Sequence, residues 1–142
     1  MSKIAQEAVV RFYDEMSDKV YGIIRMGTVL GKDMPEKTAA NIFITKGLKG
    51  EPITPYKHSM HRPMLYVDID DICKAYMVFA LKIIEGDLIK IGNSLSHIVN
   101  VYYPMPITIL ELSQIIKNII FEYTNGEINP QIRIVDKGEP LA

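Results

Sequence analysis

The sequence has one cysteine, no tryptophan and no excess of charge of either sign, and each absence excludes something. A single Cys73 cannot form an intramolecular disulfide, and without a Cys/His cluster we expect no structural zinc site. Sixteen basic against 17 acidic residues provide no electrostatic case for nucleic acid or an acidic membrane surface as a partner. The lone thiol favours a reducing, cytoplasmic setting.

Long apolar runs are missing as well. The longest run, 77–81, is far shorter than the roughly 20 residues that cross a bilayer, and the first residues carry no apolar signal segment. With 142 residues, 48% of them hydrophobic, the chain can still bury a core. We therefore predict one soluble domain or a piece of a larger one, with no membrane partner.

Helical and extended patterns alternate along the chain. Apolar residues recur at helical spacing over 4–16 behind Ser2, a plausible N-cap, and the nearly all-apolar segment 20–26 is typical of a parallel strand buried on both faces. Residues 27–36 are then expected to form a loop at the carboxyl end of this strand, where α/β proteins bind ligands. The helix and the strand together favour an α/β layer fold.

The rest of the chain repeats this alternation. Aspartates precede one helix, Thr108 and Glu111 have the spacing of a capping box at the start of another, and Asn125-Gly126 ends it. The expected elements are a helix at 38–48, an extended stretch at 51–56, a loop at 57–63, strands at 64–67, 98–102 and 132–135, a connection at 86–97, helices over 72–84 and 108–124, and no structure of its own for 136–142.

Several residues invite a chemical interpretation, and each has a simpler structural alternative. Asp68, Asp70 and Asp71 could hold a metal ion, but a helix start explains them better, and the calcium-loop glycine and glutamate are missing. His58 and His61 lie in a predicted loop without a third ligand, so no metal site is predicted. Cys73 is expected to be a small buried hydrophobe on its helix.

With these segments placed, the chain resembles the carboxyl half of the extended short-chain dehydrogenase/reductase family, the NAD-dependent nucleotide-sugar epimerases and dehydratases. Ser2-Lys3-Ile4-Ala5-Gln6-Glu7 is similar to the family segment Tyr-x-x-Ser-Lys-x-x-x-Glu. The resemblance implies that Lys3 is catalytic: its ammonium would lower the pKa of the tyrosine acid/base and bind the nicotinamide ribose. The tyrosine itself would stand two residues before Met1.

Further segments match the family in order. Arg25-Met26-Gly27-Thr28-Val29-Leu30-Gly31 resembles its Arg-x-x-Asn-Val-Tyr-Gly loop, which holds the sugar and its diphosphate, with Thr28 in place of asparagine. The stretch from Asn41 to Tyr56 is similar to the family's substrate-domain helix and Gly-x-Pro-Ile-x-x-Tyr turn. The segment 61–72 is similar to the family's Arg-x-x-x-x-Val-x-Asp-Val segment, whose arginine contacts the nucleotide diphosphate. The resemblance thus implies substrate binding by Gly27, Thr28, Asn41, Tyr56 and Arg62; a surface arginine, or one paired with Asp68, is the alternative for Arg62.

The departures from the family are as informative as the matches. No glycine-rich phosphate loop occurs, and the βαβ unit that would carry it is absent. NAD or NADP is implied by the family, but binding by this chain alone is not expected. We predict a single partial domain: 1–31 would be the end of a Rossmann-like sheet carrying the Lys3 helix, and 32–142 mainly the small substrate-binding subdomain with returning elements.

Two functions follow from this sequence. The chain resembles the substrate-binding and partial catalytic half of an NAD-dependent nucleotide-sugar epimerase or dehydratase, inactive by itself. The alternative is a non-catalytic remnant or a module that binds nucleotides or protein through an exposed sheet edge. Either way, removing half of a doubly wound sheet predicts a homo-oligomer or association with a missing half.

Overall fold

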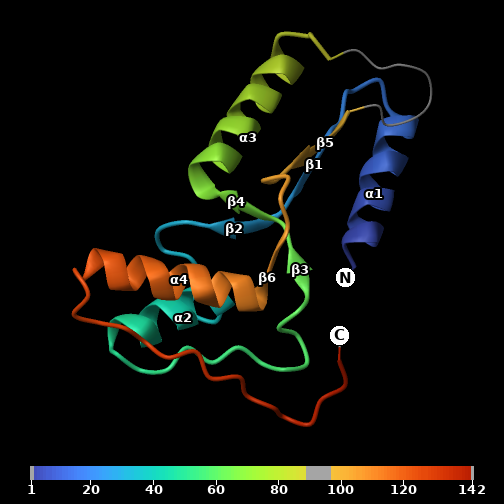
Figure 1. The fold of residues 1–142 in the computed structure, drawn as a ribbon. Coiled ribbons are helices and arrows are strands. Elements are labelled where there is room, and N and C mark those ends of the chain that lie inside the picture. The colour runs from blue at the N-terminus through green and yellow to red at the C-terminus, as the bar shows by residue number, and fades with distance from the viewer. Residues whose placement is uncertain (1, 89–96, 142) are drawn as a thin grey trace. The chain divides into compact units, whose positions relative to one another are not determined.

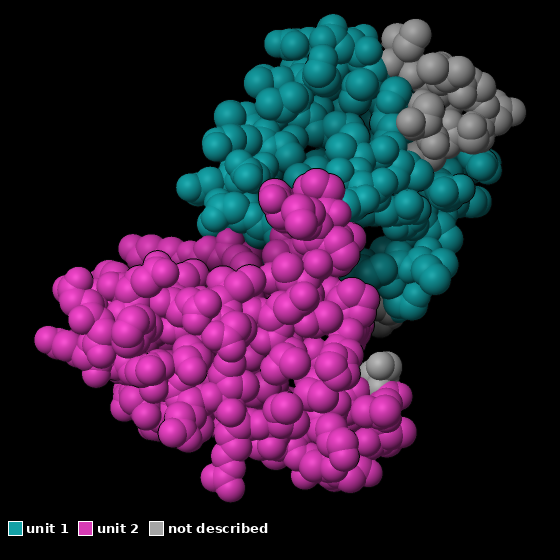
Figure 2. All heavy atoms as spheres, in the orientation of Figure 1, with its two compact units in different colours: residues 1–29, 67–102 teal, residues 30–66, 103–142 magenta. Residues whose placement is uncertain are grey.

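The computed structural model describes residues 2–88 and 97–141, which form two compact units. Unit 1 contains residues 1–29 and 67–102, and unit 2 contains residues 30–66 and 103–142 (Figure 2). The elements are α1 (Lys3–Met16), β1 (Ile23–Met26), β2 (Thr28–Leu30), α2 (Ala39–Leu48), β3 (Pro63–Met64), β4 (Tyr66–Asp68), α3 (Ile69–Ile84), β5 (Ile98–Val101), β6 (Ile107–Thr108) and α4 (Ile109–Tyr123) (Figure 1). The chain passes between the units within β2 and β4.

Unit 1 is built around two parallel strands. β1 pairs with β5 in a register that runs from Ile23 opposite Ile98 to Met26 opposite Val101. The amides of Ile23 and Gly27 donate to the carbonyls of His97 and Val101 at 2.9 and 3.0 Å. The parallel pairing of strands from either side of a helix confirms the α/β fold class.

A helix packs on each face of this strand pair. A Cβ added to Gly22 would overlap the Phe79 ring of α3, so glycine is needed for that close approach. Arg25 reaches the other way, because side chains alternate along a strand, and pairs with Glu7 of α1. Residues 18 positions apart in sequence thus fix α1 to the strand by a charged contact rather than an apolar one.

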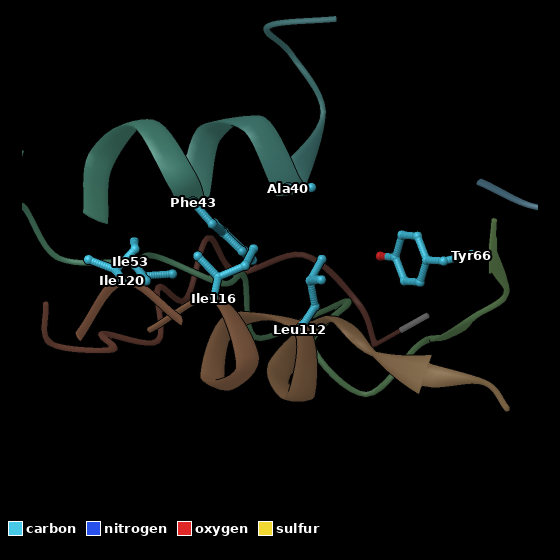
Figure 3. Packing of buried hydrophobic residues seen from close by; sticks show 7 residues of the cluster. All are labelled: Ala40, Phe43, Ile53, Tyr66, Leu112, Ile116 and Ile120. Carbon is cyan, nitrogen blue, oxygen red and sulfur yellow. The ribbon is translucent and has the colours of Figure 1, made fainter. Parts of the chain in front are cut away.

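Unit 2 has a closed apolar core between α2 and α4 (Figures 1 and 3). Phe43 points from α2 toward Ile116 and Ile120 of α4, and all three are at most 6% exposed (Figure 3). Ile53, from the segment after α2, is fully buried beside them. The antiparallel strands β3 and β6 pair Pro63 with Thr108 and Met64 with Ile107 next to this core.

The helix ends confirm the predictions made from local sequence. Ser2 caps α1 by accepting a hydrogen bond from the Ile4 amide at 3.2 Å. Thr108 and Glu111 form both hydrogen bonds of a capping box. The chain leaves α4 through Asn125 and Gly126, both with positive φ, as that dipeptide predicts.

Some predicted elements are shorter or split. The strand expected at 20–26 occupies only Ile23–Met26, and burial on both faces is wrong because Arg25 and Met26 are exposed in a two-stranded pair. The predicted loop 27–36 contains β2, and the strand expected at 64–67 is divided between β3 and β4. Segment 132–135 forms only isolated bridges, and 89–96 of the connection lie outside the described residues.

Cys73 corrects another prediction. We expected it to be buried on the apolar side of its helix, but the structure exposes it. The residue does lie on an apolar strip of α3, together with Met77 and Ile84, which are 60% and 79% exposed. Ile72, one position earlier, is 5% exposed, so the buried side of α3 includes Ile72 but not Cys73.

Candidate functional site

Lys3, the predicted catalytic residue, begins α1 in unit 1. It is exposed, and its ammonium makes no ion pair within residues 2–88 and 97–141. One turn later, Glu7 Oε1 and Oε2 accept hydrogen bonds from Arg25 Nε and Nη2 at 2.9 and 2.6 Å. The hydrogen bond from Arg25 lowers the pKa of Glu7, and Glu7 raises the pKa of Arg25. Glu7 is therefore already engaged by Arg25.

Gly27 and Thr28 follow β1 directly. The Gly27 amide belongs to the strand ladder through Val101, and Thr28 opens β2 with an intermediate exposure. Both therefore lie at the carboxyl end of a parallel strand, the edge where α/β proteins bind ligands.

Asn41 in the first turn of α2 lines a pocket of about 420 Å³ together with Glu36, Ile42, Thr45 and Lys46. Its amide is largely engaged within unit 2: Nδ2 donates to the Met34 carbonyl and Oδ1 accepts from Thr45, both at 3.0 Å. The side chain thus fixes the preceding loop and keeps one N–H and one lone pair for a ligand.

Tyr56 lies beside the C-terminal segment. Its ring is 40% exposed and stacks with the His58 ring at a centroid distance of 5.7 Å and an angle of 16°. The Lys137 ammonium lies 4.0 Å from the centroid of the Tyr56 ring, within the range of a cation–π interaction. The predicted binding residue is therefore in contact with side chains that the sequence pattern did not connect to it.

Arg62 follows a turn in which its amide donates to the Ser59 carbonyl at 3.1 Å. Its guanidinium is exposed, and no ion pair engages it within the part of the chain that the structure describes. The fork of donors that suits a diphosphate is therefore open. Arg62, Asn41 and Tyr56 belong to unit 2, whereas Lys3, Gly27 and Thr28 belong to unit 1.

The acidic and histidine candidates also have definite places. Asp68 is the N-cap of α3 and accepts from the Asp70 amide at 2.8 Å, so the helix-start interpretation of this cluster is confirmed. His58 lies 3.3 Å from Glu139, and His61 is exposed. Among the described residues, no group of three or more His, Cys, Asp or Glu side chains could hold a metal ion.

Comparisons with known proteins bear on the fold. No protein-family model matches the chain, and no curated protein matches it. Among solved structures, UDP-glucose 4-epimerase from Thermus thermophilus, solved with NAD, is 20% identical with a TM-score of 0.69. The match covers 97% of this chain and 43% of that one.

Two further solved structures are similar. dTDP-glucose 4,6-dehydratase from Bacillus anthracis, in complex with NAD, is 13% identical with a TM-score of 0.67, over 94% of this chain and 38% of that one. UDP-glucuronic acid 4-epimerase from Bacillus cereus, in complex with UDP-glucuronic acid and NAD, is 20% identical with a TM-score of 0.67, over 97% and 40%. The chain thus has the fold of the carboxyl-terminal part of Rossmann-like epimerases and dehydratases and spans about two fifths of their length.

No helix of the described residues is long and apolar enough to cross a membrane.

The sequence did not indicate the network of side-chain contacts that joins residues 56–58 to residues 136–139. The alternating charges of Asp136, Lys137 and Glu139 were the available signal, but a short charged tail has the same composition when it is solvated.

Proposed function

We propose that the chain is the substrate-binding and partial catalytic part of an NAD-dependent nucleotide-sugar epimerase or dehydratase, an isomerase or oxidoreductase of the cytoplasm. The observation that carries the proposal is the match of nearly the whole chain to NAD-bound enzymes of this kind at TM-scores of 0.65–0.69. The match leaves more than half of each neighbour without a counterpart here, so complete turnover requires residues outside 1–142.

The residues present do not fit NAD or NADP by themselves. The sequence has no glycine-rich turn between a strand and a helix, so it cannot form the backbone cradle that a pyrophosphate needs. Lys3 is the one residue that we assign to the cofactor side, as a cation at the start of α1. We therefore propose that this chain transfers no hydride by itself and is catalytically inactive alone.

The substrate side is better represented. Arg62 is an exposed guanidinium, whose planar fork can donate two parallel hydrogen bonds to a diphosphate. In unit 2, Asn41 lines a pocket and Tyr56 offers an aromatic face. In unit 1, Thr28 follows β1 and provides a hydroxyl, whereas the amide of Gly27 is already bonded to the Val101 carbonyl. We propose that the three residues of unit 2 contact a nucleotide sugar, and for Gly27 and Thr28 of unit 1 the same role rests on the family resemblance alone.

Calorimetric titration with UDP-glucose, UDP-glucuronic acid and dTDP-glucose tests this assignment. We expect measurable heat with at least one of them, and Arg62→Met should reduce that affinity at least tenfold because a charged, bidentate contact is lost. Arg133→Met is the matched control, since Arg133 is another exposed arginine of unit 2. No heat and no shift in melting temperature with any of the three would refute the proposal.

A second candidate function, association with another polypeptide, is favoured by α1. The buried side of this helix carries Asp14, which is only 3% exposed, and the Glu7–Arg25 pair. Phe12 and Met16, on the opposite side, are 58% and 71% exposed. This polar-in, apolar-out arrangement is the reverse of an ordinary surface helix and is typical of an interaction surface.

The free edge of β1 points to the same function. Ile23 and Gly27 turn their amides toward β5, so the alternate residues Ile24 and Met26 direct theirs to the opposite edge. Within the described residues of unit 1, no other strand pairs with that edge. An exposed edge next to an apolar helix can accept a strand from another segment, so we propose a homo-oligomer or a complex with a missing half.

A further inference from the structure

The C-terminal segment runs alongside the residues that precede Arg62. Residues 53 and 56 form parallel bridges with 132 and 135. The Val135 amide donates to the Pro55 carbonyl at 3.0 Å, and the Lys57 amide donates to the Val135 carbonyl at 2.9 Å. These hydrogen bonds place residues 136–139 next to the side chains of residues 56–58.

Three side-chain contacts then join the two segments. Lys57 Nζ lies 2.8 Å from Asp136 Oδ2, and His58 Nε2 lies 3.3 Å from Glu139 Oε2. Lys137 makes its cation–π contact with Tyr56. Each charged residue of 136–139 thus meets a complementary group, and Gly138, with φ of 71°, allows the backbone turn between the second and third of them.

We propose that residues 135–139 form a clasp over Tyr56 that closes when His58 is protonated and loosens when it is neutral. Only the expected effect of the clasp on ligand binding rests on the proposed function, since Tyr56 is one of the residues assigned to the nucleotide sugar. The clasp itself is a property of the polypeptide and can be tested without ligand.

The groups that surround His58 determine the direction of this dependence. Glu139 pairs with its Nε2, and the charge of Asp136 lies within electrostatic reach. The Tyr56 ring stacks with it, the Lys137 ammonium lies on that same ring, and Lys57 precedes it. Its Nδ1 is buried without a hydrogen-bond partner within the described residues. A protonated ring forms a charge-assisted ion pair with Glu139, whereas the neutral ring offers Glu139 only an uncharged hydrogen bond.

The other pair of the clasp does not titrate in the same range. The hydrogen bond from Lys57 lowers the pKa of Asp136, and the same contact raises the pKa of Lys57. The Lys57–Asp136 pair therefore stays charged throughout the window of about pH 5–8 in which histidine normally changes its charge. Of the ion pairs named here, only the one between His58 and Glu139 requires a proton on a histidine, so lower pH tightens the clasp.

Amide hydrogen exchange measured by NMR tests the clasp directly. The protection of the Val135 and Lys57 amides, corrected for intrinsic exchange, should fall about two- to fivefold between about pH 5.5 and about pH 8, as expected for an exposed ion pair. The Tyr103 amide, which donates to the Tyr66 carbonyl at 2.7 Å in the same unit, should not change. Equal protection of Val135 and Lys57 at both pH values would overturn the proposal.

Variants test whether His58 is the residue that makes the amide protection depend on pH. His58→Gln should abolish the pH dependence, whereas His61→Gln, at an exposed histidine three residues later, should preserve it. Glu139→Gln should act like His58→Gln and changes only an exposed carboxylate, so it remains informative if His58→Gln does not fold. Asp136→Asn should weaken protection at both pH values. Loss of the pH dependence in His61→Gln but not in Glu139→Gln would overturn the assignment.

The consequence for binding is measured separately. If Tyr56 contacts the nucleotide sugar, Glu139→Gln should raise the affinity at about pH 5.5 about two- to fivefold and leave it unchanged at about pH 8. A pH-dependent clasp without any nucleotide-sugar heat would refute the proposed function and keep the clasp. Binding heat that Glu139→Gln does not change, together with amide exchange that does not depend on pH, would refute the clasp and keep the proposed function.

Discussion

The two units use similar amphipathic helices to different ends. In unit 2, Phe43 of α2 is 4% exposed and lies against α4 in a closed core. In unit 1, Phe12 of α1 is 58% exposed, and the helix turns Asp14 inward instead. The comparison shows that one unit buries the aromatic face of its helix, whereas the other leaves that face exposed. Apolar periodicity identifies a face in both, and only packing partners decide whether that face is buried.

The largest test of this comparison is a matched pair of truncations. Phe43→Ala should reduce the free energy of unfolding by about 3–5 kcal/mol, because it leaves a cavity between α2 and α4. Phe12→Ala should change it by no more than about 0.5 kcal/mol, because the ring is already in water. Urea denaturation measures both, and similar losses in the two variants would contradict the distinction between the units.

Association of the isolated chain is the next test. We expect sedimentation velocity to show dimers or larger species, and the double variant Phe12→Glu, Met16→Glu should raise the concentration needed for association by more than about tenfold. Ile119→Glu, at a residue of α4 that is 56% exposed, is the control in unit 2 and should leave association unchanged. A monomer at every concentration would show that the exposed apolar face of α1, with Phe12 and Met16, does not mediate association.

The helix caps give a smaller contrast. Thr108→Ala removes a capping box at the start of a helix that packs into the core, so it should cost about 1 kcal/mol in thermal unfolding. Ser2→Ala removes the cap of α1, whose apolar side has no cover, and should lower the helix content near residue 3 with little change in the melting temperature. Equal shifts in melting temperature would indicate that α1 is as tightly integrated as α4.

The smallest effect concerns the Glu7–Arg25 pair in unit 1. Arg25 lowers the pKa of Glu7 below its ordinary value. The stabilisation of the fold by this ion pair is therefore fully present at a pH above the ordinary pKa of glutamate, and it is lost as the pH falls through the lowered pKa. NMR titration of the Glu7 carboxyl should show this lowered pKa, and Arg25→Met should raise the pKa toward the ordinary value of a glutamate. An unchanged titration in Arg25→Met would assign the shift to another cause.

Local sequence signals predicted the helices well and the strands less well. Ser2, Thr108 and the Asn125-Gly126 pair act within a few residues of themselves, so their structural effect can be read without knowledge of the fold. The extent of β1, and the reduction of 132–135 to bridges, depend on partners distant in sequence. Cys73 was predicted to be buried for the same reason: its apolar neighbours were visible, but the missing cover was not.

The candidate site shows the same limit. Lys3, Arg62 and the other assigned residues come from short motifs, and their roles stay predictions. The contacts of Tyr56 with Lys137, and of His58 with Glu139, join residues about 80 positions apart. A charged tail such as 136–139 has no periodic pattern, so nothing in its sequence distinguished a solvated end from a docked one.

Each unit is discontinuous in the chain: it takes one stretch from the first half and another from the second. No single cut can therefore release either unit as a continuous polypeptide, and a gene shortened within residues 30–66 would damage both. Because each unit is made of two separate stretches, an exchange of either unit alone would have to replace two segments of the chain at once.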